Sequence, residues 1–353
     1  MVIYLFYYLL LGFCAIFFSK FKNKKANIIH LLIVFLGIFF IVGFRHPSMG
    51  VDLQYGTNDG YIGMYKLIAS SSFKDVLNQN FMNFEKGYVI FNKLISYFGN
   101  NEQVLLIASA ILSLFPICYI YWKYSDNFEL SMIVYISLTC FLMTFSGLRQ
   151  ACAIGICFSS FYFIKNRKII PFVLLVILAY TFHSSAIFFL LAYPIYILNI
   201  KKQYRFYTLI LVLVVFVFRT QIFNLLAPLI KEDAIPDNNG AITLFLIFIL
   251  IYVFCCFFIY DNQESSGLLN LFLLAILCQA FGNIYSIAGR IGYYFMPFLG
   301  LLLPKTLISM KYGEREITSI VLTIAFVGYG LYIIYAAGNS WAETYPWIPF
   351  WSH

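Results

Sequence analysis

Charged residues are scarce in this chain. Asp, Glu, Lys and Arg make up only 11% of its 353 residues, whereas apolar residues make up 62%. A soluble domain carries about a quarter charged residues, so this composition excludes an ordinary soluble fold. It predicts instead an all-α integral membrane protein that folds as a single polytopic domain over residues 1–353. The net charge of +8 does not indicate a nucleic-acid partner, because the basic residues follow membrane topology.

The sequence also lacks a metal-binding pattern. Its eight cysteines lie inside apolar runs without zinc-like or disulfide-like spacing, so we expect them to be small hydrophobic residues. Asp52 and Asp59 are seven residues apart, and no Asp-x-Asp motif or His/carboxylate cluster is present. We therefore expect neither a metal nor any other cofactor.

The N-terminus lacks the basic region with which a cleavable signal peptide begins. The first charges follow the first apolar run, at residues 20–25. Under the positive-inside rule, this order places the N-terminus outside and these lysines in the cytoplasm.

Long apolar runs make up most of the sequence. Roughly 17–22 apolar residues suffice to cross a hydrocarbon core of about 30 Å. About twelve such runs occur, near residues 2–18, 27–44, 103–122, 129–146, 148–164, 169–182, 184–199, 206–227, 241–260, 268–286, 292–310 and 317–336. With the N-terminus outside, the basic segments near residues 123, 165–168, 201–205 and 311–315 are all cytoplasmic, and the C-terminus lies outside.

The segment 169–199 allows two topologies. One long tilted helix would bury His183 and invert every later span. A hairpin with its tip at residues 183–185 keeps both flanking basic runs in the cytoplasm, and we favour it. Since the fifteen residues from Lys168 to His183 span only about 22 Å of helix, the tip would stop short of the outer surface and place His183 in a cavity.

Residues 45–102 form the only sizeable hydrophilic segment, between the second and third spans. Its apolar residues recur at helical spacing, which predicts short amphipathic helices on the outer membrane surface; they are Tyr61, Met64, Tyr65 and Ile68, then Tyr88, Phe91, Leu94, Ile95 and Phe98. The C-terminal tail is rich in tryptophan and is interpreted as an interfacial anchor, with a grip on sugar rings as the alternative.

Polar groups gather at the predicted outer ends of the spans. An arginine at bilayer depth costs a few kcal/mol, so it normally faces a partner or a cavity. Arg45, Arg149 and Arg290 could converge on a diphosphate, since each guanidinium offers a planar fork of donors. Alternatively, each arginine extends to the lipid headgroups or pairs with a carboxylate such as Asp52 or Glu85.

His183 could exchange a proton near neutral pH, or it could simply close a hairpin through hydrogen bonds. Asp52 and Glu85 could serve as bases or as partners of the arginines. The composition of the site alone leaves these alternatives open.

Taken together, these segments resemble the EpsG family of Wzy-type polysaccharide polymerases. The resemblance covers about residues 40–300 and rests on the order of short motifs. These are Phe44-Arg45, Gly50-Val51-Asp52 with Tyr55, Glu85-Lys86-Gly87-Tyr88 leading into Asn92-Lys93-Leu94-Ile95, Leu148-Arg149-Gln150-Ala151, the basic run 165–168, Phe182-His183-Ser184-Ser185-Ala186, and Arg290 with Tyr293-Tyr294-Phe295. Lys86 departs from the small residue that many relatives carry.

The resemblance implies a metal-independent, GT-C-like glycosyltransferase in the bacterial cytoplasmic membrane, with its active site facing outward. Such an enzyme transfers a growing glycan from undecaprenyl diphosphate to the non-reducing-end hydroxyl of a new lipid-linked repeat unit. Its partners would be undecaprenyl-diphosphate-linked glycans, membrane lipids, and the flippase and chain-length regulator of the same pathway.

The same resemblance suggests roles for individual residues. Arg149 and Arg290 would bind the diphosphate, and Arg45 would assist them or hold the external loop. His183 or Glu85 would be the base, and Asp52 would orient Arg45 or the acceptor. The supporting residues would be Gln150, Tyr55, Tyr88 and Tyr293.

Three other functions are alternatives to a polymerase. A ligase that moves a finished glycan to another acceptor uses the same chemistry. A flippase or transporter of lipid-linked sugars would need ionisable groups along a path through the bilayer, whereas here they gather at one face. A membrane acyltransferase would need its His and Arg on the cytoplasmic side.

Overall fold

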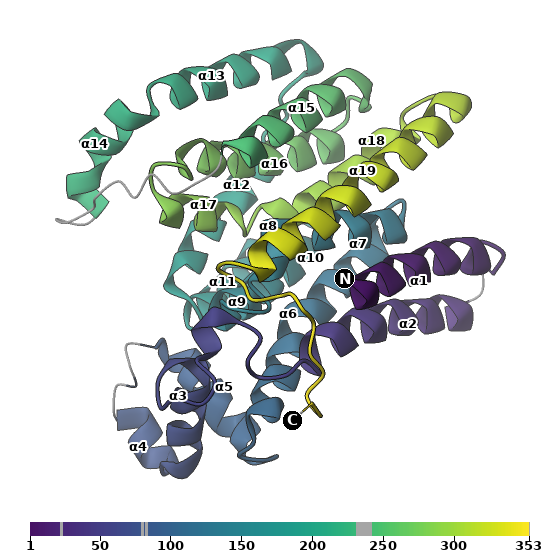
Figure 1. Cartoon of the computed structure of the whole chain (residues 1–353). Coiled ribbons are helices and arrows are strands. Elements are labelled where there is room, and N and C mark those ends of the chain that lie inside the picture. Colours follow the sequence, from purple (N-terminus) through teal and green to yellow (C-terminus); the bar gives the residue numbers. More distant parts are fainter. Residues whose placement is uncertain (22–23, 79–80, 82–83, 231–241, 353) are drawn as a thin grey trace.

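The computed structural model describes residues 1–21, 24–78, 81, 84–230 and 242–352. Over that part of the chain every regular element is a helix, and the only extended pairing is an isolated bridge between Arg45 and Pro349. The helices form one bundle with a smaller helical lobe at one end (Figure 1). The all-α prediction is confirmed.

Four of the described helices are long and apolar enough to cross a membrane: α2 (Lys24–Gly43), α6 (Glu102–Tyr124), α16 (Gln263–Phe281) and α19 (Tyr312–Gly338). The count rises to six if each of two bent pairs is one span. These pairs are α13 (Arg205–Val217) with α14 (Arg219–Ile230), bent by 70°, and α17 (Ser286–Gly292) with η4 (Met296–Phe298) and α18 (Leu299–Ile308), bent by 41°. The apolar helices indicate a membrane protein, but twelve spans are not confirmed.

Some predicted spans are shorter than expected or interrupted. α1 (Val2–Phe18) and α15 (Thr243–Phe258) are shorter apolar helices, and residue 241 of the span predicted at 241–260 lies outside the described residues. The run 129–146 divides into α7 (Phe128–Ile136) and α8 (Thr139–Leu142), and the run 148–164 divides into α9 (Leu148–Ser159) and α10 (Phe161–Lys165).

Serine hydroxyls accompany both interruptions. The Ser137 hydroxyl lies 2.8 Å from the carbonyl oxygen of Ile133 and 2.6 Å from that of Phe326 on α19. Ser160 donates to the carbonyl of Cys157 at 2.6 Å. Such bonds compete with the helical backbone pattern, and hydropathy alone does not detect them.

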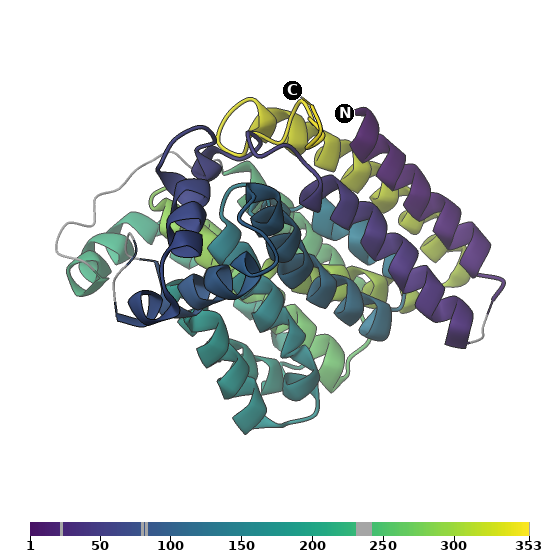
Figure 2. The same cartoon turned by 90° about the horizontal axis from the view of Figure 1, so that it is seen from below.

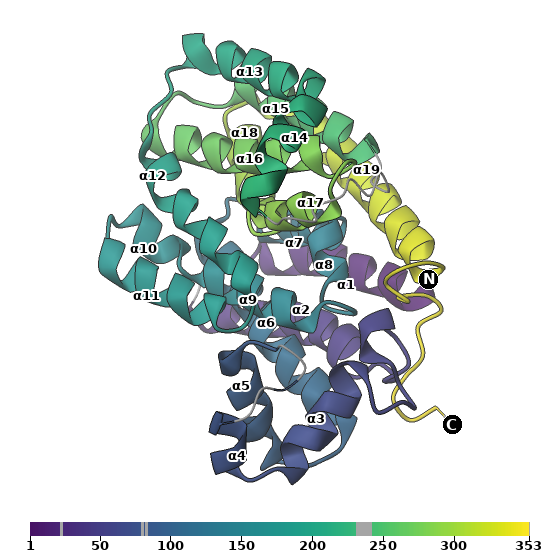
Figure 3. The same ribbon diagram turned by 90° about the vertical axis from the view of Figure 1, so that its left-hand side faces the viewer.

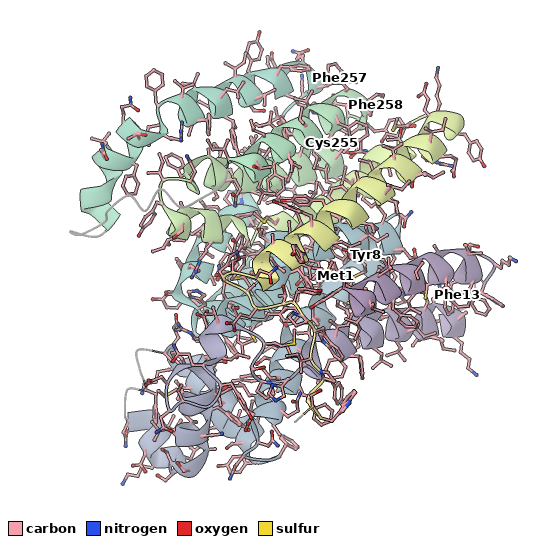
Figure 4. The ribbon with its side chains drawn as sticks, in the orientation of Figure 1. Met1, Tyr8, Phe13, Cys255, Phe257 and Phe258 are labelled. Carbon is pink, nitrogen blue, oxygen red and sulfur yellow. The ribbon has the colours of Figure 1, made fainter. Side chains whose placement is uncertain are left out.

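Large apolar side chains cover the outside of the bundle as well as its inside. Phe13 and Phe257 point outward with more than half of their surface exposed, whereas Tyr8 and Cys255 are buried (Figure 4). An apolar exterior of this kind suits contact with lipid tails. The eight cysteines are free; seven are buried and Cys278 is partly exposed.

The chain makes a turn at His183, as the hairpin prediction requires. α11 (Ile169–Tyr180) precedes the turn, and η2 (Ser184–Leu191) and α12 (Ala192–Ile197) follow it. The ring of Phe172 on α11 lies 6.0 Å from that of Phe189 and 5.4 Å from that of Tyr193. The two arms therefore pack side by side, which excludes one continuous helix.

Residues 45–102 form the lobe, which contains η1 (Val51–Leu53), α3 (Gly60–Ser70), α4 (Phe73–Asn78) and α5 (Lys86–Ser96) (Figures 1 and 2). The predicted amphipathic helices are present, and the lobe has a small apolar core of Met64, Ile68, Val76, Phe81 and Val89. The Lys93 ammonium donates to the carbonyls of Ala69 and Ser71 at 2.9 and 2.7 Å, which ties α5 to the end of α3.

The C-terminal tail returns to the same end of the bundle and lies against the start of the lobe. The indole of Trp347 donates to the carbonyl of Ile41 at 2.9 Å, and Tyr4 donates to that of Thr344 at 2.7 Å. The N-terminal helix thus contacts the start of the tail, and both termini lie on the same side of the molecule (Figure 3). The tail is bound to protein at Trp347, while Trp351 stays exposed.

The opposite end of the bundle is rich in ion pairs. Lys165 contacts Glu264, Arg205 contacts Asp261, and the His30 ring contacts Glu129, each at 2.7 Å. These residues stand at the helix ends that the charge pattern assigns to the cytoplasm. The two ends therefore differ in chemistry.

Candidate active site

Glu85 lies at the centre of a polar cluster at the lobe end of the bundle. Its Oε2 atom accepts a hydrogen bond from Arg149 Nη1 at 2.6 Å. Its Oε1 atom accepts one from the Ser184 amide at 2.8 Å and lies 3.4 Å from His183 Nδ1. The structure thus joins the lobe, the start of α9 and the hairpin tip through one carboxylate.

A close backbone approach places Glu85 there. The Tyr88 amide donates to the carbonyl of Thr181 at 3.1 Å, which docks the start of α5 onto the hairpin turn. A Cβ atom on Gly87 would lie 2.1 Å from Thr181 Oγ1 and 2.8 Å from the Thr181 carbonyl oxygen. Only glycine fits at this contact, which gives the Glu85-Lys86-Gly87-Tyr88 motif a physical meaning.

Arg149 stands at the start of α9 and keeps part of its guanidinium free. The group lies 4.3 Å above the ring of Phe84, and Arg149 Nε donates to the Tyr61 hydroxyl at 3.4 Å. Among the described residues, nothing accepts a hydrogen bond from Nη2, and about a quarter of the side chain is exposed. Arg149 is therefore held on one side and open to an anion on the other.

The environment of Glu85 keeps it ionised. Partial burial alone would raise its pKa, but the adjacent His183 ring, the hydrogen bond from the Ser184 amide and the charge of Arg149 lower the pKa to about 2. A carboxylate with so low a pKa is a poor proton acceptor at neutral pH. Of the two candidate bases, the geometry favours His183, with Glu85 holding the ring.

Asp52, Gln150 and Arg290 extend the cluster. Partial burial raises the pKa of Asp52, and the charges of Arg290 and Arg149 oppose this, so both arginines lie within its electrostatic reach. Gln150 donates to the carbonyl of Arg290 at 2.8 Å and ties α9 to α17. The Arg290 side chain is exposed, and no described carboxylate lies within 4 Å of it. Tyr293 lies one turn farther along, within electrostatic reach of Arg290.

Arg45 occupies a different environment. It is fully buried, and its guanidinium donates to the carbonyls of Met49, Val42 and Phe145 at 3.1, 2.5 and 2.9 Å. Gly50 beside it has φ +123°, and a Cβ there would lie 2.2 Å from the Phe145 carbonyl. This carbonyl cage favours the loop-holding role expected for Arg45 over contact with a diphosphate.

Two further expectations do not match the contacts. No ion pair joins Asp52 to Arg45 in the described part of the chain, so Asp52 does not orient that arginine. Tyr55 packs against the His46 ring, with centroids 5.0 Å apart, and in the described part of the chain no hydrogen bond joins it to Glu85 or Arg149. Tyr88 is fully buried beside Tyr61 and supports the cluster through packing.

Sequence reasoning missed three groups that complete the cluster. Tyr61 was assigned only to an amphipathic face, and Phe84 and the Ser184 amide received no role. Phe84 directly precedes Glu85, but an apolar residue at that position carries no distinctive signal. No group of three or more His, Cys, Asp or Glu side chains suited to a metal ion occurs in the ranges that the structure describes.

The profile of the EpsG family matches residues 28–352, which is nearly the whole chain and includes every residue of the cluster. The chain belongs to the EpsG family. Membership indicates a polysaccharide-polymerase-type role for this EpsG-family protein. Neither the curated proteins nor the solved structures contain a match to it.

Substituting Gly87 with alanine is expected to lower activity at least tenfold while Glu85, Arg149 and His183 remain in place. The new Cβ would push α5 away from Thr181, and displacements near 1 Å can cost about a hundredfold in rate. Polysaccharide formation by the purified EpsG-family protein checks this. Gly12→Ala on α1, where nothing lies within 4 Å of the new atom, is the matched control. Equal activity of the two variants would contradict the close-approach argument.

Glu85 is expected to stabilise the EpsG-family protein in a pH-dependent way. Because its folded-state pKa of about 2 lies below the ordinary value of 4.5, its contribution is fully present above about pH 4.5 and is lost as the pH falls toward 2. The contribution is at most about 3 kcal/mol. At pH 7 the melting temperature of Glu85→Gln should be lower than that of wild type, and the two melting temperatures should converge toward pH 3. Glu316→Gln, at an exposed pair with Arg315, should differ little from wild type at either pH.

Substituting Arg45 is expected to lower stability, whereas substituting Arg290 is expected to lower activity. Arg45→Ala leaves three carbonyls without their buried donor, so the melting temperature and the protein level should fall. Arg290→Ala removes an exposed cation, so turnover should fall about tenfold or more at an unchanged melting temperature. Thermal unfolding in detergent and turnover measured side by side check both. If Arg45→Ala lost activity at full stability, Arg45 would have to be assigned to the anion site.

Proposed function

We propose that this protein polymerises lipid-linked oligosaccharide repeat units. The growing glycan would be transferred from undecaprenyl diphosphate to the non-reducing-end hydroxyl of a fresh lipid-linked unit. The observation that carries the proposal is the Glu85 cluster, in which one carboxylate holds a partly free arginine and a histidine side by side. Family membership adds the class of reaction.

The chemistry of the transfer matches the groups present. The acceptor oxygen attacks the anomeric carbon, and the bond from that carbon to the phosphate oxygen breaks with its electron pair leaving on the diphosphate. Arg149 Nη2 and the Arg290 guanidinium would bind the charge that develops there. The hydroxyl proton would pass to His183 Nε2, since Nδ1 faces Glu85.

Glu85 and Gln150 would act as positioning residues. Glu85 fixes Arg149 and the His183 ring relative to each other, and Gln150 holds the backbone of Arg290. The Asp52 side chain reaches solvent although protein partly surrounds it, and it lies within electrostatic reach of both arginines, which suits contact with the acceptor sugar. These roles use only residues at one end of the bundle.

The proposed orientation follows from charge. The basic helix ends opposite the cluster would lie in the cytoplasm, so the Glu85 cluster would face outward at the level of the lipid headgroups. There it would meet lipid-linked units delivered by a flippase of the same pathway, and a chain-length regulator would be a further partner. The localisation would be the bacterial cytoplasmic membrane, with both termini outside.

Product analysis tests the function directly. Purified protein in lipid nanodiscs is supplied with lipid-linked repeat units alone, and the products are separated by size. A ladder of multiples is expected, with release of undecaprenyl diphosphate. Single units that are consumed only when another acceptor is added would indicate a ligase, and unchanged units that cross a bilayer would indicate a flippase.

A further inference from the structure

The hydroxyl of Tyr294 contacts the hairpin tip beside His183. It lies 3.1 Å from Ser185 Oγ, so one of the two hydroxyls donates a hydrogen bond to the other. Tyr294 is fully buried, and within the described ranges Ser185 is the only residue that bonds to its hydroxyl. A buried hydroxyl whose one partner is 109 residues away in sequence fixes two distant segments relative to each other.

Both partners stand next to residues of the proposed reaction. Ser185 follows His183 by two residues, and Tyr294 follows Arg290 by four. The chain between Arg290 and Tyr294 is short and bonded to itself, since the Tyr293 amide donates to the carbonyl of Arg290 at 3.1 Å. A shift of Tyr294 would therefore move the backbone of Arg290 as well.

The Ser185–Tyr294 hydrogen bond completes a set of three connections around the site. Glu85 connects α9 to the hairpin turn, and Gln150 connects α9 to the carbonyl of Arg290 on α17. The new bond connects the chain just beyond α17 to the hairpin, so each of the three elements is bonded to the other two. In the described part of the chain, α17 would otherwise be joined to those two elements by the single hydrogen bond from Gln150.

Apolar packing accompanies this hydrogen bond. The ring of Phe189 on η2 stacks on those of Phe295 and Phe298, with centroids 5.7 and 6.1 Å apart. α17 also packs closely on α16, where a Cβ atom on Gly292 would lie 3.0 Å from that of Cys278. Since this packing does not depend on the hydroxyls, loss of the bond should displace Arg290 slightly and leave the protein folded.

We propose that Ser185 and Tyr294 are positioning residues that set the distance between the His183 ring and the Arg290 guanidinium. The inference rests on the proposed function, in which His183 takes the acceptor proton while Arg290 binds the leaving diphosphate. Both groups must act at the same anomeric carbon, and displacements near 1 Å can cost about a hundredfold in rate. Because Tyr294 is buried and would not touch the substrate, its loss should act on kcat rather than on KM.

A double-mutant cycle tests the pair. Tyr294→Phe and Ser185→Ala are each expected to lower kcat about tenfold, with KM within about twofold of wild type. Because both changes remove the same hydrogen bond, the double variant should also be about tenfold slower, whereas independent residues would together cost about a hundredfold. Ser185→Thr keeps a hydroxyl and should recover most of the rate. A multiplied loss in the double variant, or no loss in Tyr294→Phe, would overturn the proposal.

Tyr252→Phe is the matched control. Tyr252 is also buried, and its hydroxyl lies 2.7 Å from Thr208 Oγ1 at the basic end of the bundle. This variant should lose about as much thermal stability as Tyr294→Phe while keeping the wild-type kcat. An equal fall of kcat in the two variants would refute a positioning role for the Ser185–Tyr294 bond.

Amide hydrogen exchange separates this proposal from polymerisation, because it requires no transfer reaction. In Tyr294→Phe, exchange should become severalfold faster in the hairpin turn and in α17, and in Tyr252→Phe it should stay unchanged there. Faster exchange at these sites, with no glycan ladder from the wild type, would support the connection and refute polymerisation. A normal ladder, with unchanged exchange and unchanged kcat in Tyr294→Phe, would refute the connection and leave polymerisation intact.

Discussion

Alanine in place of Arg149 is expected to abolish polymer formation, with single lipid-linked repeat units accumulating in its place. Arg149 offers a free Nη2 edge beside His183, and donors aimed at a developing anion are each worth about a hundred- to a thousandfold in rate. The loss should appear in kcat more than in KM, because the interaction strengthens as the diphosphate leaves. Single-turnover assays with purified lipid-linked units measure it.

Two variants separate the anion role of Arg149 from a structural one. Arg149→Lys keeps the positive charge beside Glu85 but loses the planar fork, so it should fold normally and recover only part of the rate. Arg219→Ala removes an arginine that contacts Asn283 and the Phe216 carbonyl and lies outside the cluster, so it should polymerise normally. Normal chain lengths in Arg149→Ala, at a normal protein level, would contradict the assignment.

The sequence placed Arg149 and His183 at the same end of the bundle for a sound physical reason. Each residue stands where an apolar run meets a turn, and alternation of basic loops assigns those turns to one side. The sequence names Glu85 as a candidate base or arginine partner, but it does not place this carboxylate between Arg149 and His183. Glu85 is 64 residues from Arg149 and 98 from His183, and the contact depends on how the lobe docks at Gly87.

Hydropathy also overestimated the lengths of spans. It counts Ser137 and Ser160 as mild interruptions of apolar runs, whereas their hydroxyls bond to backbone carbonyls where α7 and α9 end. A similar limit applies to Arg45. A charge beside an apolar span predicts a polar partner. Only the folded chain shows whether that partner is a set of buried backbone carbonyls, as for Arg45, or an anion that binds from outside.

His183 carries the second large prediction. If His183 Nε2 accepts the acceptor proton, His183→Gln should lower turnover by about a hundred- to ten-thousandfold. Single-turnover assays with purified lipid-linked units measure the loss. Glu85 is a weak alternative acceptor at neutral pH, because its pKa of about 2 keeps it ionised.

The bundle contains its own control for a histidine beside a carboxylate. His30 lies 2.7 Å from Glu129 at the opposite end, so His30→Gln should keep the wild-type rate. Glu85→Asp tests the positioning role, because a shorter carboxylate retains the charge but reaches the His183 ring less well. The turnover of Glu85→Asp should lie between that of wild type and that of Glu85→Gln. Turnover near the wild-type rate in His183→Gln would assign the proton transfer to another group, and Asp52, whose pKa is raised by partial burial, would then be the next residue to test.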